Sequence, residues 1–418
     1  MGKWVKALVG DIELNRDIEL LLVIGGLYAL SIALSNTFVN VYLWKQSEDF
    51  MKLAIYNLFI VIMQPLTFIL AGMWAKKIDR VIVLRLGVIF LSIFYLTVLT
   101  LGESAGKYII LLGILLGIGY GFYWLSFNVL TFEITEPETR DFFNGFLGLL
   151  TSFGGMVGPF FAGVVITYME ELTGYTVVFA SSLCLFLTAV ILSFFLNRRS
   201  AEGAYHLYDV FQSRKDYSPW KKVLMANFFQ GLREGTFIFT IVVLVFISTD
   251  SELALGTYGL IVSATAFACY YLIGRFLSKK HRKKAILIGG FILYVAVFLI
   301  IFDLNFARLV TYGVIASIAY PLLLVPYLSL SYDVIGSGWK AREMRIEYIV
   351  IRELYLGTGR ITSILLLLLS IFVFGEEKGI SVALVVLAIG HLCIYGWIKS
   401  IHIPTTLDKE TFTALKKR

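Results

Sequence analysis

The chain has 418 residues, of which 58% are hydrophobic and only 16% are charged. Soluble domains average about 45 to 50% apolar residues, so this composition excludes a soluble protein and indicates an integral membrane protein. The net charge of +7 does not indicate nucleic-acid binding, because the basic residues lie between apolar segments, where they act as topology signals.

A helix needs about 20 apolar residues to cross the hydrocarbon core of a bilayer. Runs of this kind follow one another along the chain at 20–44, 50–75, 82–102, 108–132, 144–169, 175–196, 223–248, 254–277, 284–304, 307–332, 346–374 and 379–401. The sequence therefore predicts an all-α membrane protein with twelve spans. We expect a six-helix half at 1–196, a linker at 197–222, a second six-helix half at 223–401 and a tail at 402–418.

Lysine and arginine gather in alternate connections, such as KK at 76–77, RR at 198–199 and KKHRKK at 279–284. The other connections are poor in basic residues. Because basic loops next to spanning segments stay in the cytoplasm, we expect a protein of the cell membrane with both termini, the linker and the tail on the cytoplasmic side.

Two segments recur at an offset close to half the chain length. AGMWAKKIDRVIVL at 71–84 aligns without gaps with GRFLSKKHRKKAIL at 274–287, and TRDFFNG at 139–145 aligns with AREMRIE at 341–347. Duplicated halves of a transporter enclose a cavity between them, so this repeat predicts a transport protein.

The fifth span contains GGMVGPFFAG at 154–163. Glycines allow helix backbones to approach closely, and proline removes one helical hydrogen bond and favours a kink. Simple helix packing and a role in export both account for this segment, whose candidate residues are Gly154, Gly155, Gly158, Pro159 and Gly163.

These features resemble the major facilitator superfamily across essentially the whole chain. GMWAKKIDR at 72–80 is similar to the family's loop motif after the second helix, although Lys76 stands where an acid is usual and Asp79 where a glycine is usual. The exchange at Lys76 puts the family's Asp-centred latch in doubt. We treat this loop as part of a gate, with the candidates Gly72, Lys76, Lys77, Asp79 and Arg80. GGMVGPFFAG is similar to a motif of family exporters and antiporters, and therefore implies the exporter-like branch.

In the family that this chain resembles, the first, fourth, seventh and tenth helices line the central cavity. Asn36 and Asn40 of the first span share a helix face, which suits hydrogen bonds to a substrate or, equally, bonds between helices worth about 0.6 kcal/mol each. The further cavity candidates are Tyr28 in the first span, Tyr123, Trp124 and Asn128 in the fourth, and Gln230 in the seventh.

The first span holds no acid, so a proton-carrying group must lie elsewhere. Gln230 and Glu234 are four residues apart in the seventh span and Arg233 is adjacent, so one local network is possible. A carboxyl group in a low-dielectric site keeps its proton more readily than in water, which makes Glu234 the first candidate for proton exchange. Arg233 and Glu353 are the other candidates for proton coupling. A structural ion pair near the interface is the alternative.

The stretch IRELYLGTGR at 351–360 places charges inside the eleventh span. Glu353 and Arg360 lie on one helical stripe with Gly357, whereas Arg352 points about 100° away. We expect Glu353 to pair with a basic residue of the 72–80 loop, and Arg360 with an acid or carbonyl across the interface, when the gate is shut. A permanent network within the C-terminal half is the alternative for Glu353, Arg352 and Arg360.

The sequence contains no HExxH, GxSxG or Walker motif and no cysteine spacing typical of zinc, so we expect no enzyme activity, cofactor or metal. We predict a monomeric secondary active transporter in contact with membrane lipids, coupled to protons and exporting an amphipathic or drug-like small molecule. A lipid or glycolipid flippase, a solute importer and a non-transporting receptor or assembly partner remain alternatives.

Overall fold

The computed structural model describes residues 15–134, 137–169, 171–198, 203–302, 304–341 and 343–401. Within them, twelve helices are long and apolar enough to cross a membrane, as the sequence predicts. The first six are α2 (Arg16–Ser47), α3 (Phe50–Lys77), α4 (Arg80–Leu101), α5 (Ile109–Ile134), α6 (Pro137–Tyr168) and α7 (Glu171–Ser193). A short 3-10 helix, η1 (Gly102–Lys107), follows α4.

The remaining spans form a second group. They are α9 (Ser218–Thr249), α10 (Glu252–Phe276), α11 (Arg282–Ala296) with α12 (Phe298–Ile301), α13 (Phe306–Gly336), α14 (Arg345–Phe374) and α15 (Glu376–Ile398). The single run predicted at 284–304 is interrupted at Val297, between α11 and α12. The short helices α8 (Leu207–Gln212) and η2 (Lys279–His281) lie in the polar connections before α9 and α11.

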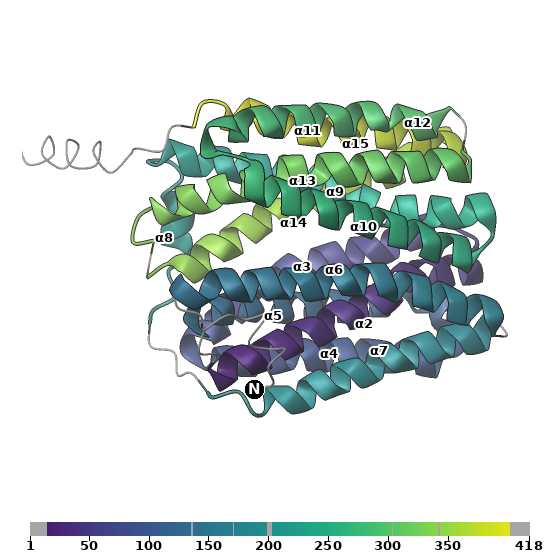
Figure 1. The fold of residues 1–418 in the computed structure, drawn as a ribbon, viewed down its shortest axis with the longest axis horizontal. Helices are drawn as coiled ribbons and strands as arrows, with labels where there is room; N and C mark the ends of the chain where they lie inside the picture. The colour runs from purple at the N-terminus through teal and green to yellow at the C-terminus, as the bar shows by residue number, and fades with distance from the viewer. Residues whose placement is uncertain are drawn as a thin grey trace, which may run out of the picture.

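Figure 1 shows these two groups as separate layers, the N-terminal bundle α2–α7 below and the C-terminal bundle α9–α15 above. The helix α8 lies at one end of both bundles. We call this end the linker side and the other end the far side. The linker side carries the 72–80 loop, and the far side carries the connection between α9 and α10.

Short polar side chains fix where the spans begin. Asp49 accepts hydrogen bonds from the first backbone N–H groups of α3, Asp79 does so for α4, and Ser251 does so for α10. The first turn of a helix leaves backbone N–H groups without intrahelical partners, so these caps define the starts of the spans.

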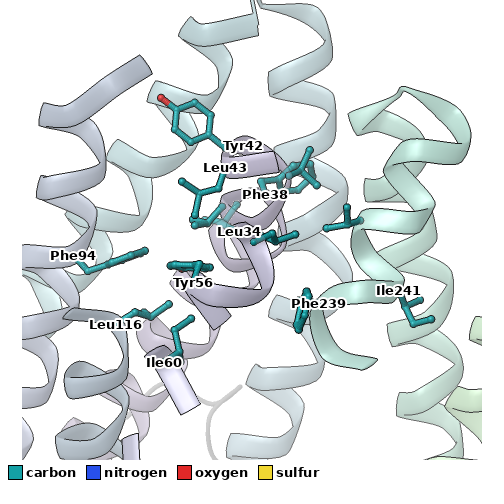
Figure 2. Packing of buried hydrophobic residues seen from close by; sticks show 14 of the residues in the cluster. Leu34, Phe38, Tyr42, Leu43, Tyr56, Ile60, Phe94, Leu116, Phe239 and Ile241 are labelled. Carbon is teal, nitrogen blue, oxygen red and sulfur yellow. The ribbon is translucent and has the colours of Figure 1, made fainter. Parts of the chain in front are cut away.

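The largest apolar cluster fills the N-terminal bundle and continues into α9. Figure 2 shows Phe38 of α2 and Tyr56 of α3 in this cluster, together with Phe239 of α9. Phe50 and Phe239 lie 6.0 Å apart between ring centroids, and Trp44 and Phe246 lie 5.9 Å apart. The two bundles are therefore joined towards the far side by buried aromatic contacts.

Within the C-terminal bundle, α9 and α14 touch through their backbones. A Cβ atom added to Gly231 would lie 2.1 Å from the carbonyl oxygen of Leu356, and one added to Gly359 would lie 2.0 Å from that of Phe228. Real Cβ atoms do not approach backbone atoms so closely, so both positions require glycine. This contact brings the polar residues of α9 and α14 together.

We predict that Gly359→Ala destabilises the protein by about 1 to 3 kcal/mol, because the added methyl group must push α9 and α14 apart. Gly274→Ala is the matched control, since a Cβ atom there meets nothing within 4 Å. The purified variants are heated, and the protein that remains folded is measured by size-exclusion chromatography. Only Gly359→Ala should show a lower Tm. Equal Tm values would contradict the backbone contact.

Candidate functional site

A central cavity of about 500 Å³ lies between the two bundles. Its walls come from α2, α3 and α5 on one side and from α9, α13 and α14 on the other. Five of the cavity residues expected from the sequence line it: Tyr28, Asn36, Asn40, Trp124 and Asn128. Arg352, Glu353 and Arg360 line it as well.

The wall of the N-terminal bundle carries an amide network. Tyr120 donates to Asn36 (3.2 Å), and Asn57 donates to Asn40 (2.9 Å). The two asparagines of α2 thus face the cavity and also bind α3 and α5. Their spacing serves contacts between helices, and hydrogen bonding to a substrate stays a prediction.

An aromatic stack supports the same wall. The ring of Tyr28 lies on that of Tyr123, with centroids 3.7 Å apart, and Trp124 meets Tyr28 edge to face. Tyr123 is 1% exposed and does not line the cavity, so the expectation of a direct role was wrong. Its backbone packs against Gly87 of α4, which turns its ring towards Tyr28. Trp124 is 39% exposed and supplies the aromatic surface.

Arg360 is shared by two carboxylates on the other wall. Its Nη2 lies 2.9 Å from Oε2 of Glu234 in α9, and its Nη1 lies 3.5 Å from Oε1 of Glu353 in α14. Glu353 also accepts a hydrogen bond from Gln64 of α3 (3.1 Å). The two carboxylates are buried and Arg360 is partly exposed to the cavities. The shorter contact, with Glu234, has the length of a charge-assisted hydrogen bond.

Glu234 has two further donors. Gln230 donates to it at 2.8 Å and Tyr320 of α13 at 2.7 Å. Gln230 is buried behind Glu234 and does not line the cavity, contrary to expectation. Arg233 is not part of this network: it donates to Tyr312 (3.0 Å) and its guanidinium carbon lies 4.3 Å from the centroid of the Phe237 ring. Adjacent residues of a helix point about 100° apart, which separates the two charges.

A second cavity of about 510 Å³ lies inside the C-terminal bundle, between α9, α10 and α13. We call it the side cavity. Its lining is mainly apolar and aromatic, with Arg233, Glu234 and Arg360 as its charged residues. Arg360 and Ile238 line both cavities, so the ion pair of Arg360 with Glu234 stands between them.

The linker side carries a buried ion pair between the bundles, which we call the linker latch. Nζ of Lys76 in α3 lies 2.5 Å from Oε1 of Glu347 in α14, and both side chains are buried. Lys76 also donates to backbone oxygens of Ala204 and Glu343, and the N–H of His206 donates to Glu347. The linker therefore encloses the latch.

The expected pair of Glu353 with a base of the 72–80 loop was wrong. Lys76 meets Glu347, about one and a half turns before Glu353, and Lys77 is exposed. The long side chain of Arg360 spans Gly357, which lacks a side chain, and this lets Glu353 pair within its own helix. Pro65 of α3 packs on Gly357 at the same place.

The other gate candidates hold the loop in shape. Asp79 is buried as the cap of α4, and Arg80 pairs with Glu133 at 2.9 Å. A Cβ atom on Gly72 would lie 2.8 Å from the hydroxyl oxygen of Tyr205, so the linker packs directly on this glycine. Burial raises the pKa of the Tyr205 hydroxyl, and the nearby Glu347 raises it further.

The far side carries a corresponding contact, the far clamp. Nζ of Lys45 in α2 lies 3.0 Å from Oε1 of Glu252 in α10, and Tyr175 of α7 donates to the same carboxylate (3.0 Å). Lys45 and Glu252 both lie at the ends of spans, and this position could have identified them from the sequence. Nothing in the sequence pattern, by contrast, connects Glu347 with Lys76.

The Gly-Pro segment of α6 packs against two helices. Gly154 and Gly158 face α2 at Leu30 and Ala33, whereas Gly155 and Gly163 face α10 at Ser263 and Glu252. Pro159 contacts Gly256 and Gly259 of α10. All five residues are thus used in helix packing, and the contact of Pro159 with α10 joins the two bundles.

Twelve spans in two bundles, with a polar cavity between them and ion pairs bridging both ends, are the architecture of a membrane transporter. The chain belongs to the Major Facilitator Superfamily, whose family model matches residues 21–343. It is a secondary transporter and not an enzyme.

Several known proteins are similar to this chain, among them two relatives and two solved structures. The Bacillus subtilis (strain 168) protein YqgE is 59% identical over 397 residues, 95% of this chain and 92% of that protein. A Geobacillus stearothermophilus protein encoded in the sodM 3' region is 64% identical over 172 residues, which cover 41% of this chain and 80% of that protein. Both are described as uncharacterized.

The solved structures are more distant. The human organic anion transporter MFSD10 (TETRAN) has a TM-score of 0.66 and 14% identity, covering 92% of this chain and 99% of that one. A bacterial homolog of the human lysosomal transporter Spinster, solved inward-facing and unoccupied, has a TM-score of 0.64 and 16% identity, covering 94% and 100%. At these identities the likeness shows the fold alone.

We predict that Glu347→Gln destabilises the protein by about 3 to 5 kcal/mol, because it leaves the Lys76 ammonium buried without a counter-charge. In a double-mutant cycle with Lys76→Met, the double variant should lose less stability than the two single variants lose together. Thermal unfolding gives the energies.

Asp333→Asn is the control for this cycle. It breaks the pair of Asp333 with Arg282, which also lies on the linker side but is partly exposed and lies within one bundle. Pairs of that kind contribute about 0 to 1 kcal/mol. Additive losses in the cycle, or a loss no larger than in Asp333→Asn, would contradict a latch that holds the bundles together.

Proposed function

We propose that this transporter couples the movement of an amphipathic small molecule to protons, with the substrate in the central cavity and the proton on the Glu234–Arg360–Glu353 triad. The observation that carries the proposal is the sharing of one arginine by two buried carboxylates. When a proton neutralises one of the two acids, Arg360 still compensates the other, so the site keeps a paired charge in either state.

The triad is connected to the contact between the bundles. Glu353 accepts from Gln64 of α3, so a change in the bond between Arg360 and Glu353 acts directly on a neighbour in the N-terminal bundle. A proton on Glu234 would release one arm of Arg360 and leave Glu353 as its remaining carboxylate. The proton thus changes the contact that must rearrange during alternating access.

The two cavities support an amphipathic substrate. The central cavity offers amides, aromatic rings and charges, whereas the side cavity is mainly apolar, and Arg360 borders both. A molecule with a polar group and an apolar body can place both parts in the central cavity, and the side cavity offers further apolar surface next to Arg360. Export, the direction expected from the sequence, has no separate support, because the Gly-Pro segment is used in packing.

We infer that the linker side faces the cytoplasm, because the basic connections lie there. Asp216 is exposed in the linker. A cysteine at this position, with Cys184, Cys269 and Cys393 replaced, should resist an impermeant maleimide in intact cells and react after permeabilisation. Labelling of intact cells would reverse the orientation.

We predict that Glu234→Gln retains exchange of substrate but abolishes accumulation against a gradient, because the amide cannot carry a proton. The protein is reconstituted in liposomes that contain the pH dye pyranine. Naphthalene compounds of negative, neutral and positive charge are then added, and internal pH, uptake and counterflow are measured for each.

Glu376→Gln is the matched control, since Glu376 is an exposed acid at the start of α15. This variant should keep both the pH change and counterflow. A pH response in Glu234→Gln equal to that of the unchanged protein would move the proton site away from Glu234. Uptake without any pH change in the unchanged protein would contradict proton coupling itself.

A further inference from the structure

We propose that the substrate is an amphipathic anion whose acidic group binds Arg352, and that it moves together with one proton. This inference rests on the proposed function and names its substrate class. It depends on three observations: the charge of the cavity walls, the environment of Arg352 and the position of the shared acids.

The charged residues that line the two cavities do not balance. They are Arg233, Arg352 and Arg360 on one hand and Glu234 and Glu353 on the other, so three positive and two negative charges leave one positive charge in excess. The walls contributed by α2, α3 and α5 carry only neutral residues. Because charge is costly at membrane depth, an excess of one sign in a cavity favours a ligand of the opposite sign.

Arg352 carries the excess charge of the central cavity. Its guanidinium carbon lies 5.2 Å from the centroid of the Tyr332 ring, and its Nη1 is buried without a hydrogen-bond partner in the described part of the chain. No ion pair is formed by Arg352 among the described residues, whereas Arg360 has two. Guanidinium binds carboxylate, sulfonate and phosphate oxygens through paired N–H groups, so an acidic group of this kind fits.

The rest of the cavity suits the apolar part of such a molecule. Trp124 exposes its ring on the opposite wall, with Tyr28 packed against it. An aromatic or aliphatic body can lie on this surface while the acidic group reaches Arg352. Cationic compounds, in contrast, would place a second positive charge next to an arginine that has no counter-ion.

The anion and the proton bind cooperatively. A negative group in the cavity is repelled by the carboxylates of Glu234 and Glu353, so a proton that neutralises one of them strengthens the binding of that group. The titratable and charged groups around these acids are Arg360 and Arg352 of α14, Tyr320 of α13, Tyr270 of α10 and, on the adjacent face of α9, Arg233. Gln230 and Gln64 donate hydrogen bonds to them. One anion and one proton carry no net charge together, and they travel in the same direction.

The test uses three probes that share an aromatic body: naphthalene-1-sulfonate, 1-naphthalenemethanol and 1-naphthylmethylammonium. Binding to the full-length protein in phosphatidylcholine nanodiscs is measured by isothermal titration calorimetry. The sulfonate should bind most tightly, and Arg352→Gln should weaken it about tenfold or more while leaving the alcohol unchanged. Arg352→Lys should recover part of the loss, and Arg275→Gln, at an exposed arginine of α10, should have no effect.

Proton uptake is measured by repeating the titration in phosphate and Tris buffers, whose ionisation heats differ. Binding of the sulfonate should take up a proton, and Glu234→Gln should reduce that uptake without preventing binding. Nanodiscs with added phosphatidylglycerol identify the source of the acidic group. If the sulfonate binds less tightly in these nanodiscs, the lipid competes with it and the acidic group belongs to a lipid headgroup. If its affinity is unchanged, the acidic group belongs to a free amphiphile.

Preferential binding of the ammonium probe, no binding of any probe at millimolar concentration, or full sulfonate affinity in Arg352→Gln would each overturn the inference. Sulfonate binding that depends on Arg352 but takes up no proton would support the anion site and contradict the proton coupling proposed above. Proton uptake on binding of the ammonium probe would support the proton coupling and contradict the anion site. The two proposals can therefore fail separately.

Discussion

The ion pair between Arg360 and Glu234 determines the organisation of the functional site. It connects α9 and α14 at the point where Gly231 and Gly359 let their backbones touch, and it separates the central cavity from the side cavity. Removing a single partner would leave an uncompensated charge inside the membrane, which is strongly unfavourable. The glycines and the charges thus depend on each other.

The two bundles contribute different kinds of residues to the cavity walls. The N-terminal bundle supplies an uncharged cavity wall of amides and aromatic rings, held in place by bonds such as that of Asn57 to Asn40 and by the stack of Tyr28 on Tyr123. The C-terminal bundle supplies all charged residues of the lining. A rigid wall opposite a wall whose charge can change is suited to binding a proton and a substrate in one place.

The contacts between the bundles repeat at both ends. Among the described residues, each side has a lysine–glutamate pair, the linker latch and the far clamp. Each interface also places a proline ring on glycine, Pro65 on Gly357 and Pro159 on Gly259. Ion pairs can break and re-form, and the glycines let the helix backbones approach closely. The exchange of the family's usual acid for Lys76 is compensated by Glu347, so the linker side is still held by an ion pair between the bundles.

The sequence by itself determined the membrane class and the twelve spans, which follow from local hydrophobicity and need no knowledge of neighbours. The resemblance to the family pointed to the first and fourth spans as cavity walls, and most of the residues expected there line the cavity, but Tyr123 does not and Tyr120 was not foreseen. Only the tertiary structure decided the partners of the charges: Lys76 with Glu347, Arg360 with Glu234, and Arg352 with the ring of Tyr332 but with no ion pair among the described residues. Partners across a bundle depend on the register in which helices pack, and close backbone contacts at Gly231, Gly357 and Gly359 set that register.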